Sequence, residues 1–350
     1  AARPKKMRLG EYPTLKLAVA RKEARRLRTL VDQGRDPAAE RKQEQQRERQ
    51  EADQSFAALV ERYRELHMPH LSAKTAEDYG RLIDRYMLPA WGRRPVAKID
   101  RAAINDLLDP LRRRDIHGQA RLVFATASSL LSFAADRGWI ERNPARDMKA
   151  PKAPAARDRV LTDAEIARFW HATDQLGIPF APAFRLMLLT GARRGEVAGM
   201  TWQEIDLETA VWTIPAARAK NGREHQVDLH PLAIVELLQV QRRGDYVFGR
   251  KGPASGWGRA KTRLDGLMAR KAAQAGSDPS PPWRVHDLRR TAASGMARLG
   301  CQPIVVEKVL NHQSGAAGGL VAVYQHHDRR QERRDAITDW GDYLAGLIAC

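Results

Sequence analysis

Apolar residues recur at helical spacing along residues 55–147, with polar and basic residues between them. Ser55, Ser72 and Asp100 each stand just before such a segment, in the position where a short polar side chain caps a helix. The second segment is predicted to end at Pro89, because proline cannot continue a helix without losing a hydrogen bond. Four helices of modest length joined by short links predict a compact helical bundle.

Residues 160–350 show both helical and strand periods. Thr162 and Glu165 form a capping box that begins a helix, and the apolar string "AFRLMLLT" predicts a buried helix. The strings "AVWTIPA" and "HQVDLH" predict short strands, with the turn signal Asn221-Gly222 between them. We therefore expect a fold that is mainly α with a small β-sheet (α+β). Further helices are predicted over residues 231–241, 257–274, 286–299 and 303–311.

Two stretches of different composition separate these regions. The first holds almost no large apolar residue and mixes charges of both signs, which predicts a charged helical linker. The second, "MKAPKAPAARDR", is rich in proline, alanine and basic residues and predicts an extended linker. Before the first linker, a helix is predicted from about Leu17 to Gln33, and the segment is interpreted as the C-terminal part of a small domain. The predicted parts are residues 1–37, 38–54, 55–147, 148–159 and 160–350.

The net charge of the chain limits the functions that fit it. The 350 residues include 60 lysines and arginines against 42 aspartates and glutamates, which gives a formal net charge of +18. Such an excess attracts polyanions, of which nucleic acid is the commonest. The composition therefore predicts a protein that binds nucleic acid.

Membrane and secretory classes are not favoured. No apolar run reaches the roughly 18 residues that a membrane span needs. The string "AARPKKMRLGEYPTLKL" lacks the apolar core of a secretory signal. Cys301 and Cys350 provide neither a disulfide framework nor a metal-ligand spacing. We expect a cytoplasmic protein with no membrane partner.

Five segments carry side chains suited to chemistry on a phosphodiester. "LLTGARRGEVAGM" places an arginine after a Thr-Gly break, and "AKNGRE" places a lysine between the two predicted strands. "VHDLRRTAAS" places a histidine and an arginine at i, i+3 on one helix face. "VLNHQSG" places a histidine beyond another helix, and a tyrosine follows in "VAVYQHH". In chain order, the candidates are Arg193, Lys220, His286, Arg289, His312 and Tyr324.

In this order the segments resemble those of the tyrosine recombinases, also called phage integrases. "TGARRGE" and "HDLRRT" carry the most specific likeness, while "LNHQSG…VYQHH" and "ITDWGDYL" fit integrases of prophages and genomic islands. The resemblance implies an N-terminal arm-type domain, a helical core-binding bundle and a mixed catalytic domain. The family pattern has a glycine where this chain has Asn311, and the distance from His312 to Tyr324 is longer than in many members.

The resemblance implies cleavage of DNA without a metal or other cofactor. Tyr324 attacks the phosphodiester, forms a 3′-phosphotyrosine and releases a 5′-hydroxyl. Arg193 and Arg289 clamp the non-bridging oxygens, on which negative charge accumulates. Attack by the 5′-hydroxyl of a second DNA then gives recombination. The implied function is a site-specific recombinase that integrates or excises a mobile element.

The other candidates have implied roles in moving protons and holding the phosphate. Lys220 is the general acid for the leaving 5′-oxygen, because nearby cations lower the pKa of a lysine. His286 accepts the phenolic proton, and His312 bonds a phosphate oxygen. The implied partners are double-stranded DNA at attachment sites and further copies of the chain in a homotetramer. Proteins that bend DNA or promote excision are further candidate partners.

Plainer interpretations of the same residues stay open at this level. Tyr324 can be a half-buried aromatic residue, with Tyr343 as the rival nucleophile. Lys220 can be a solvated hairpin lysine, and His312 can cap a helix. Two other functions share the motifs: a type IB topoisomerase, which relaxes supercoils as a monomer, and a DNA-binding relative without activity.

Overall fold

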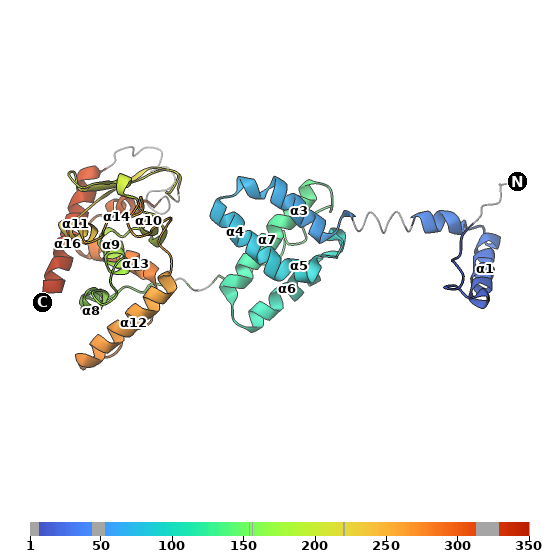
Figure 1. Cartoon of the computed structure of the whole chain (residues 1–350), viewed down its shortest axis with the longest axis horizontal. Helices are drawn as coiled ribbons and strands as arrows, with labels where there is room; N and C mark the ends of the chain where they lie inside the picture. The colour runs from blue at the N-terminus through green and yellow to red at the C-terminus, as the bar shows by residue number, and fades with distance from the viewer. Residues whose placement is uncertain are drawn as a thin grey trace. The chain divides into compact units, whose positions relative to one another are not determined.

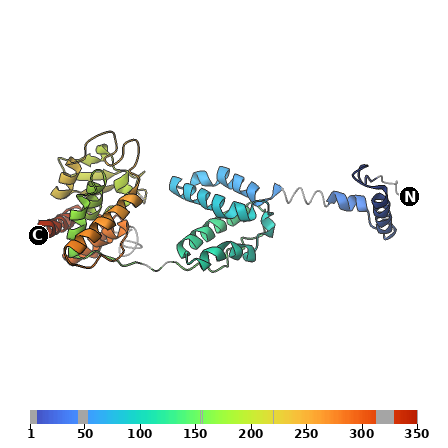
Figure 2. The same cartoon turned by 60° about the horizontal axis from the view of Figure 1, so that its bottom comes forward.

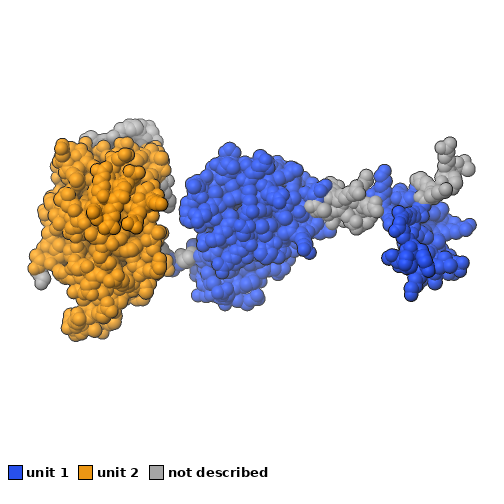
Figure 3. Space-filling model, viewed as in Figure 1, with its two compact units in different colours: residues 1–156 blue, residues 157–350 orange. Residues whose placement is uncertain are grey.

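The computed structural model of the chain describes residues 7–43, 53–153, 155, 157–219, 221–312 and 329–349. Contacts along the backbone divide the chain into two compact units, residues 1–156 and residues 157–350 (Figure 3). The expected fold class is confirmed, because helices dominate the described parts of both units and a small sheet lies in the second (Figure 1). Among the described residues, no helix combines the length and the apolar character needed to cross a bilayer.

The first helix, α1, spans Leu17–Asp32 and confirms the helix predicted for this part of the chain. It ends before Gly34, which has a φ of 80°, a left-handed conformation that glycine adopts without steric cost. Nearby, the guanidinium of Arg41 donates a hydrogen bond of 3.0 Å to the backbone carbonyl of Arg8. This contact ties together the two ends of the described segment 7–43.

The helices of residues 53–153 form the bundle seen in Figure 2. They are α3 (Phe56–Leu66), α4 (Ala73–Leu82), α5 (Leu88–Trp91), α6 (Arg101–Arg113) and α7 (His117–Asp136), with short 3-10 turns at Met68–His70 and Val96–Lys98. The side chains of Ser55, Ser72 and Asp100 each accept a backbone N–H from the first turn of the helix that follows. The three predicted caps are therefore confirmed.

The predicted helix end at Pro89 is wrong. After α4 the chain continues through a π-helical stretch, η2 (Ile83–Met87), into α5. Pro89 lies in the first turn of α5, directly after the π-helical stretch that interrupts the α-helical pattern of hydrogen bonds. The missing N–H therefore costs little, and the helical run continues to Trp91.

Perpendicular aromatic contacts fix the core of the bundle. The rings of Phe56 and Trp91 lie 5.2 Å apart at 82°, and those of Tyr63 and Phe133 do the same. The hydroxyl of Tyr63 is 2.8 Å from the hydroxyl of Ser129, so the fully buried phenol has a hydrogen-bond partner. These contacts join α3 to α5 and α7.

The helices of the second unit surround α9 (Phe180–Thr190), which is buried along nearly its whole length, as predicted for "AFRLMLLT". Thr162 and Glu165 form the predicted capping box. The other helices are α8 (Asp163–Thr173), α10 (Arg194–Ala198), α11 (Pro231–Leu238), α12 (Trp257–Gln274), α13 (Val285–Arg298), α14 (Pro303–Val309) and α16 (Arg330–Ala349). Of these, α8, α10, α11, α13 and α16 all pack against α9.

The sheet is antiparallel, in the order β1 (Ile205–Asp206), β2 (Val211–Ile214) and β3 (His225–Asp228), and a 3-10 turn, η4 (Trp202–Glu204), precedes it. Ile214 lies opposite His225, so the predicted pairing of the two strings is confirmed. The loop between them, residues 215–224, is longer than a two-residue hairpin, and Gly222 adopts a φ of 68° within it. Lys220 belongs to this loop but lies outside the described residues.

The last helix, α16, docks through Trp340. Its indole is fully buried, and Nε1 donates a hydrogen bond of 2.9 Å to the carbonyl of Leu188 in α9. The ring lies against Gly295 of α13, where an added Cβ would come within 2.2 Å of the ring carbon Cζ3. Glycine at this position therefore allows α16 to approach α13 closely.

Replacing Gly295 with alanine is expected to destabilise the chain by roughly 1–2 kcal/mol, because overpacking against a rigid indole outweighs the gain in helix propensity. Gly266 in α12 is the matched control, since nothing lies within 4 Å of a Cβ placed there. Alanine at residue 266 should stabilise the chain by up to about 1 kcal/mol. Urea unfolding of both full-length variants measures the difference, and equal midpoints would contradict this packing.

Candidate active site

Arg193 stands at the start of α10, just after the Thr-Gly break. Gly191 ends α9 with a φ of 63°, and a Cβ there would lie 2.8 Å from Cδ2 of Leu310. This close approach requires glycine, and after the turn it permits, Arg193 stands directly before the first residue of α10. One carboxylate oxygen of Glu196 accepts the backbone N–H of Arg193 at 2.8 Å, and the other pairs with Nη1 at 2.8 Å. Glu196 therefore fixes the direction of the guanidinium.

Arg289 lies on α13, and its side chain is buried, with 4% of the residue exposed. Nη1 donates to the carbonyl of Gly191 at 2.7 Å, and Nη2 donates to the carbonyl of Leu310. Burial and then the nearby charge of Arg193 lower the pKa of Arg289 to about 10. The guanidinium therefore remains charged at neutral pH, and a solvated surface role does not fit it.

The C-terminal end of α14 is where the candidate segments meet. The last carbonyls of a helix have no partner within it. Here the carbonyls of Val309, Leu310 and Asn311 accept hydrogen bonds from three segments that are far apart in the sequence. The donors are, in that order, Nε2 of His225 at 3.1 Å, Nη2 of Arg289, and Nη2 of Arg193 at 3.4 Å. The partial negative charge of a helix C-terminus favours the two guanidiniums among these donors.

The chain leaves α14 through a left-handed residue, Asn311, which has a φ of 50°. Its N–H bonds the carbonyl of Lys308 at 3.1 Å, and the N–H of His312 bonds the carbonyl of Glu307 at 3.0 Å. These two hydrogen bonds form a Schellman motif, which usually has glycine at the left-handed position and sometimes asparagine. Asn311 therefore preserves the backbone that the family's glycine would give.

His312 is partly exposed directly after this turn. Its Nδ1 is 3.2 Å from a carboxylate oxygen of Glu307, and 34% of its side chain is exposed. The backbone of His312 completes the helix cap, while its side chain stays open to solvent. The plain interpretation as a capping residue and the functional one are therefore compatible.

His225 is a residue of this site that the sequence pattern did not single out. Its imidazole is buried in β3, and burial, followed by the charge of Arg333, lowers its pKa to about 4. The ring is therefore neutral at neutral pH. Because the Val309 carbonyl can only accept, Nε2 carries the proton. The available signal was the alternation of "HQVDLH", which puts His225 and Val227 on the same face of the strand.

His286 occupies the first turn of α13 and lies at an exposed position beside Arg289. Partial burial of its ring lowers its pKa, and the charges of Arg290 and Arg289 lower it further, while Asp287 acts in the opposite direction. The imidazole is therefore mainly neutral at neutral pH and can accept a proton. Arg290, by contrast, is partly exposed and pairs with Asp287 at 2.5 Å.

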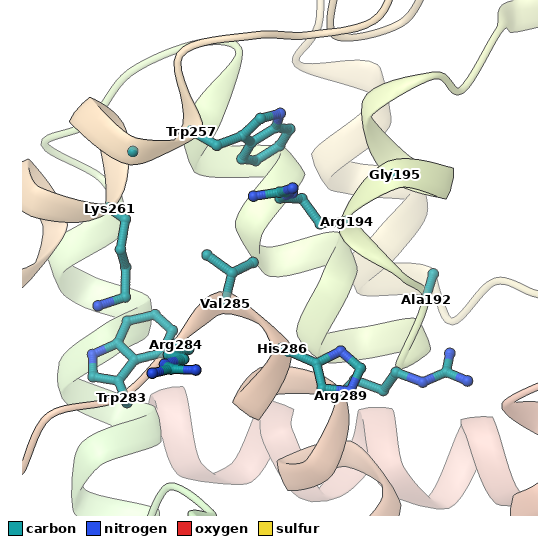
Figure 4. Close-up of a pocket in the computed structure, with 11 residues that line it drawn as sticks. Ala192, Arg194, Gly195, Trp257, Lys261, Trp283, Arg284, Val285, His286 and Arg289 are labelled. Atoms are coloured by element: carbon teal, nitrogen blue, oxygen red, sulfur yellow. The ribbon is translucent and has the colours of Figure 1, made fainter. Parts of the chain in front are cut away.

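A cavity of about 520 Å³ opens beside His286 and Arg289 (Figure 4). Basic side chains from α10, α12 and the start of α13 line it: Arg194, Lys261 and Arg284. The excess of positive groups suits an anionic ligand. Sequence reasoning left Lys261 and Arg284 out, because nothing in their local strings separates them from the many other basic residues.

Tyr343, the rival nucleophile, is engaged in packing. Its hydroxyl donates to the carboxylate of Asp163 at 2.6 Å, its ring stacks on Trp340, and the guanidinium of Arg298 lies over it. Partial burial and the bond to Asp163 raise the pKa of Tyr343, which disfavours a phenolate nucleophile. Tyr324 itself lies outside the described residues, as Lys220 does. The structure thus brings Arg193 and Arg289 together, with His286 and His312 on the adjoining segments.

The chain is similar to several known proteins along most of its length. Residues 159–331 match the phage integrase family, residues 56–151 the phage integrase central domain and residues 1–44 an arm DNA-binding domain. Prophage integrase IntA of Escherichia coli K12 is 26% identical over 347 residues, which cover 97% of this chain and 82% of that protein.

Solved structures share the fold at lower identity. A lambda integrase tetramer bound to a Holliday junction aligns with a TM-score of 0.58 at 19% identity, covering 90% of this chain and 88% of that one. The Tn1549 transposon integrase in complex with circular intermediate DNA aligns with a TM-score of 0.57 at 16% identity, covering 79% and 98%. The chain belongs to the phage integrase family, the tyrosine-type site-specific DNA recombinases.

Proposed function

We propose that this recombinase cuts and rejoins double-stranded DNA at attachment sites through a 3′-phosphotyrosyl intermediate on Tyr324. Arg193 and Arg289 converge on neighbouring carbonyls at the end of α14, and this convergence is the main support for the proposal. Two guanidiniums held in this way repel each other, and an anion bound by both relieves the repulsion. A phosphodiester is such an anion. The basic cavity beside Arg289 offers room for the adjacent phosphates of the same DNA strand.

Both guanidiniums have donors to spare for a phosphate. A guanidinium carries five N–H groups. In the described part of the chain, Arg289 directs one N–H from each Nη to a carbonyl, while Arg193 uses Nη1 on Glu196 and Nη2 on Asn311. The remaining N–H groups can bond the non-bridging oxygens. Because the protein fixes them before DNA binds, they stabilise the charge of the transition state without reorganisation.

In the cleavage step one bond to phosphorus forms as another breaks, and each proton that moves has a donor and an acceptor. The phenolic oxygen of Tyr324 forms a bond to phosphorus as its proton passes to the neutral imidazole of His286. The bond between phosphorus and the 5′-oxygen breaks, and this oxygen takes a proton from the ammonium of Lys220. His312 donates to a non-bridging oxygen. Rejoining reverses these transfers with a 5′-hydroxyl of another DNA end, so the phosphotyrosine conserves the bond energy.

The proposed partners follow from charge and from similarity. Lambda integrase binds a Holliday junction as a tetramer, and we extend this assembly to four copies of this chain on two duplexes. The formal net charge of +18 favours association with DNA. The arm DNA-binding match at residues 1–44 supports contacts at outlying sites. Proteins that bend DNA or promote excision remain candidate partners, and the proposed location is the cytoplasm.

Changing Tyr324 to phenylalanine is expected to abolish the covalent DNA adduct, because the nucleophilic oxygen is lost. Changing Tyr343 to phenylalanine should leave adduct formation intact, because its hydroxyl bonds Asp163. A nicked suicide substrate traps the adduct, which is then measured on a denaturing gel. Loss of the adduct in the Tyr343 variant alone would refute the assignment. DNA binding by the wild type without any adduct would favour the inactive relative.

Changing Arg193 to glutamine should slow single-turnover cleavage by about 100-fold or more, because one of the two charged donors to the transition state is lost. Arg298→Gln is the matched control, since its guanidinium pairs with Asp163 on another part of the unit. DNA affinity of both variants is measured by fluorescence anisotropy. Equal cleavage rates for the two variants would contradict the role of Arg193.

Changing Arg290 to glutamine is expected to raise the pKa of His286, because a positive charge that lowers it is removed. His286 accepts a proton only when neutral. The fall in cleavage rate at acid pH should therefore begin at a higher pH in this variant than in the wild type. Single-turnover rates measured from pH 5 to about 8 give the profile, a range that spans the ordinary pKa of histidine. A profile that stays in place, or that moves as much in Arg298→Gln, would exclude His286 as the base.

A further inference from the structure

An amide pair joins two segments of the candidate site. Nδ2 of Asn221 donates a short hydrogen bond to Oδ1 of Asn311, and Nδ2 of Asn311 approaches Oδ1 of Asn221 at 3.5 Å. The two residues are 90 positions apart, and both are partly buried. Asn221 belongs to the loop 215–224, while Asn311 lies just beyond the end of α14. The pair therefore connects the loop between β2 and β3 to the helix end that receives both arginines.

The identity of Asn311 cannot be explained by its backbone alone. Its φ of 50° and its Schellman hydrogen bonds would suit glycine at least as well. What asparagine adds is the side-chain amide, and this amide bonds Asn221. The carbonyl of the same residue accepts from Arg193. One residue thus contacts both the loop and the first arginine through different groups.

Asn221 is itself held in place. Its Oδ1 accepts the backbone N–H of Arg223 at 3.3 Å, a local turn that limits the rotation of the side chain. Gly222 follows with its φ of 68°. A second hydrogen bond runs from Nε2 of His225, the first residue of β3 after this loop, to the carbonyl of Val309. The loop is therefore anchored to α14 on both sides of residues 222–224.

We propose that Asn221 and Asn311 are positioning residues that fix the loop of Lys220 relative to the two arginines. The inference rests on the proposed role of Lys220 as general acid, since Lys220 is the covalent neighbour of Asn221. A proton donor must lie within hydrogen-bond reach of the leaving 5′-oxygen at the moment the bond to phosphorus breaks. The amide pair restricts the loop that carries the donor, and it acts through Lys220 without touching DNA.

A sulfur-bridged substrate separates this role from a merely structural one. When sulfur replaces the bridging 5′-oxygen, the leaving group is a thiolate, whose conjugate acid has a pKa of about 8.5, as for cysteine. Such a leaving group departs without a proton. Variants that misplace the proton donor should therefore be slow on ordinary DNA and fast on sulfur-bridged DNA. Variants that disturb the arginines or the fold should be slow on both.

The variants are Asn311→Gly, which keeps the left-handed backbone, and Asn221→Ala. On ordinary DNA each should lower the single-turnover cleavage rate by roughly tenfold, the scale of one lost hydrogen bond. The double variant should be no slower than either single one, because both remove the same interaction. On the sulfur-bridged substrate all three should match the wild type. Affinity for DNA should not change.

Lys220→Ala, measured on both substrates, separates failure of this inference from failure of the proposed function. Suppose that sulfur rescues Lys220→Ala but Asn311→Gly cleaves both substrates slowly. The positioning role of the asparagines would then be wrong, while the general-acid role of Lys220 would stand. Wild-type rates for the asparagine variants on ordinary DNA would overturn it as well. If sulfur fails to rescue Lys220→Ala, the general-acid role of Lys220 is wrong, and the inference falls with it.

Discussion

The carbonyl groups at the C-terminal end of α14 are the constraint on which the candidate site depends. A helix end leaves these acceptors unpaired, and here three consecutive ones are satisfied by side chains from β3, α13 and the start of α10. A buried carbonyl without a hydrogen-bond partner costs free energy, and this cost keeps each donor at its carbonyl. The requirement to satisfy one short helix thus brings together segments that are up to 118 residues apart.

This arrangement also governs the electrostatics of the site. Two guanidiniums are placed near each other in a partly buried position, and the pKa of Arg289 falls to about 10 as a result of burial and of the charge on Arg193. Glu196 and the helix carbonyls offset part of the repulsion. Partial burial lowers the pKa of His286 as well, and the charges of Arg290 and Arg289 lower it further. The unmatched positive charge suits an anionic substrate. A neutral histidine can accept the proton that the proposed nucleophile, Tyr324, must lose.

Local signals made most of the fold predictable. Capping residues and strand alternation depend only on neighbours in sequence. The helices that begin after Ser55, Ser72, Asp100 and Thr162 and the two longer strands are therefore predicted correctly. The helix end at Pro89 was not, because a π-helical stretch moved the proline into a first turn where it is tolerated. The order of the motifs predicts the site residues, and of these the structure brings Arg193 and Arg289 together at the end of α14. The contacts of His225 and Asn311 could not be predicted, because they join positions that no local pattern relates.

The most direct test of the central claim is an experimental structure of the chain trapped covalently on a suicide DNA substrate. We expect a phosphate bonded to Tyr324, with its non-bridging oxygens within hydrogen-bond distance of Arg193 and Arg289. Both guanidiniums should keep their bonds to the end of α14. A phosphate bonded to another residue, or arginines that leave the helix end to reach it, would contradict the account.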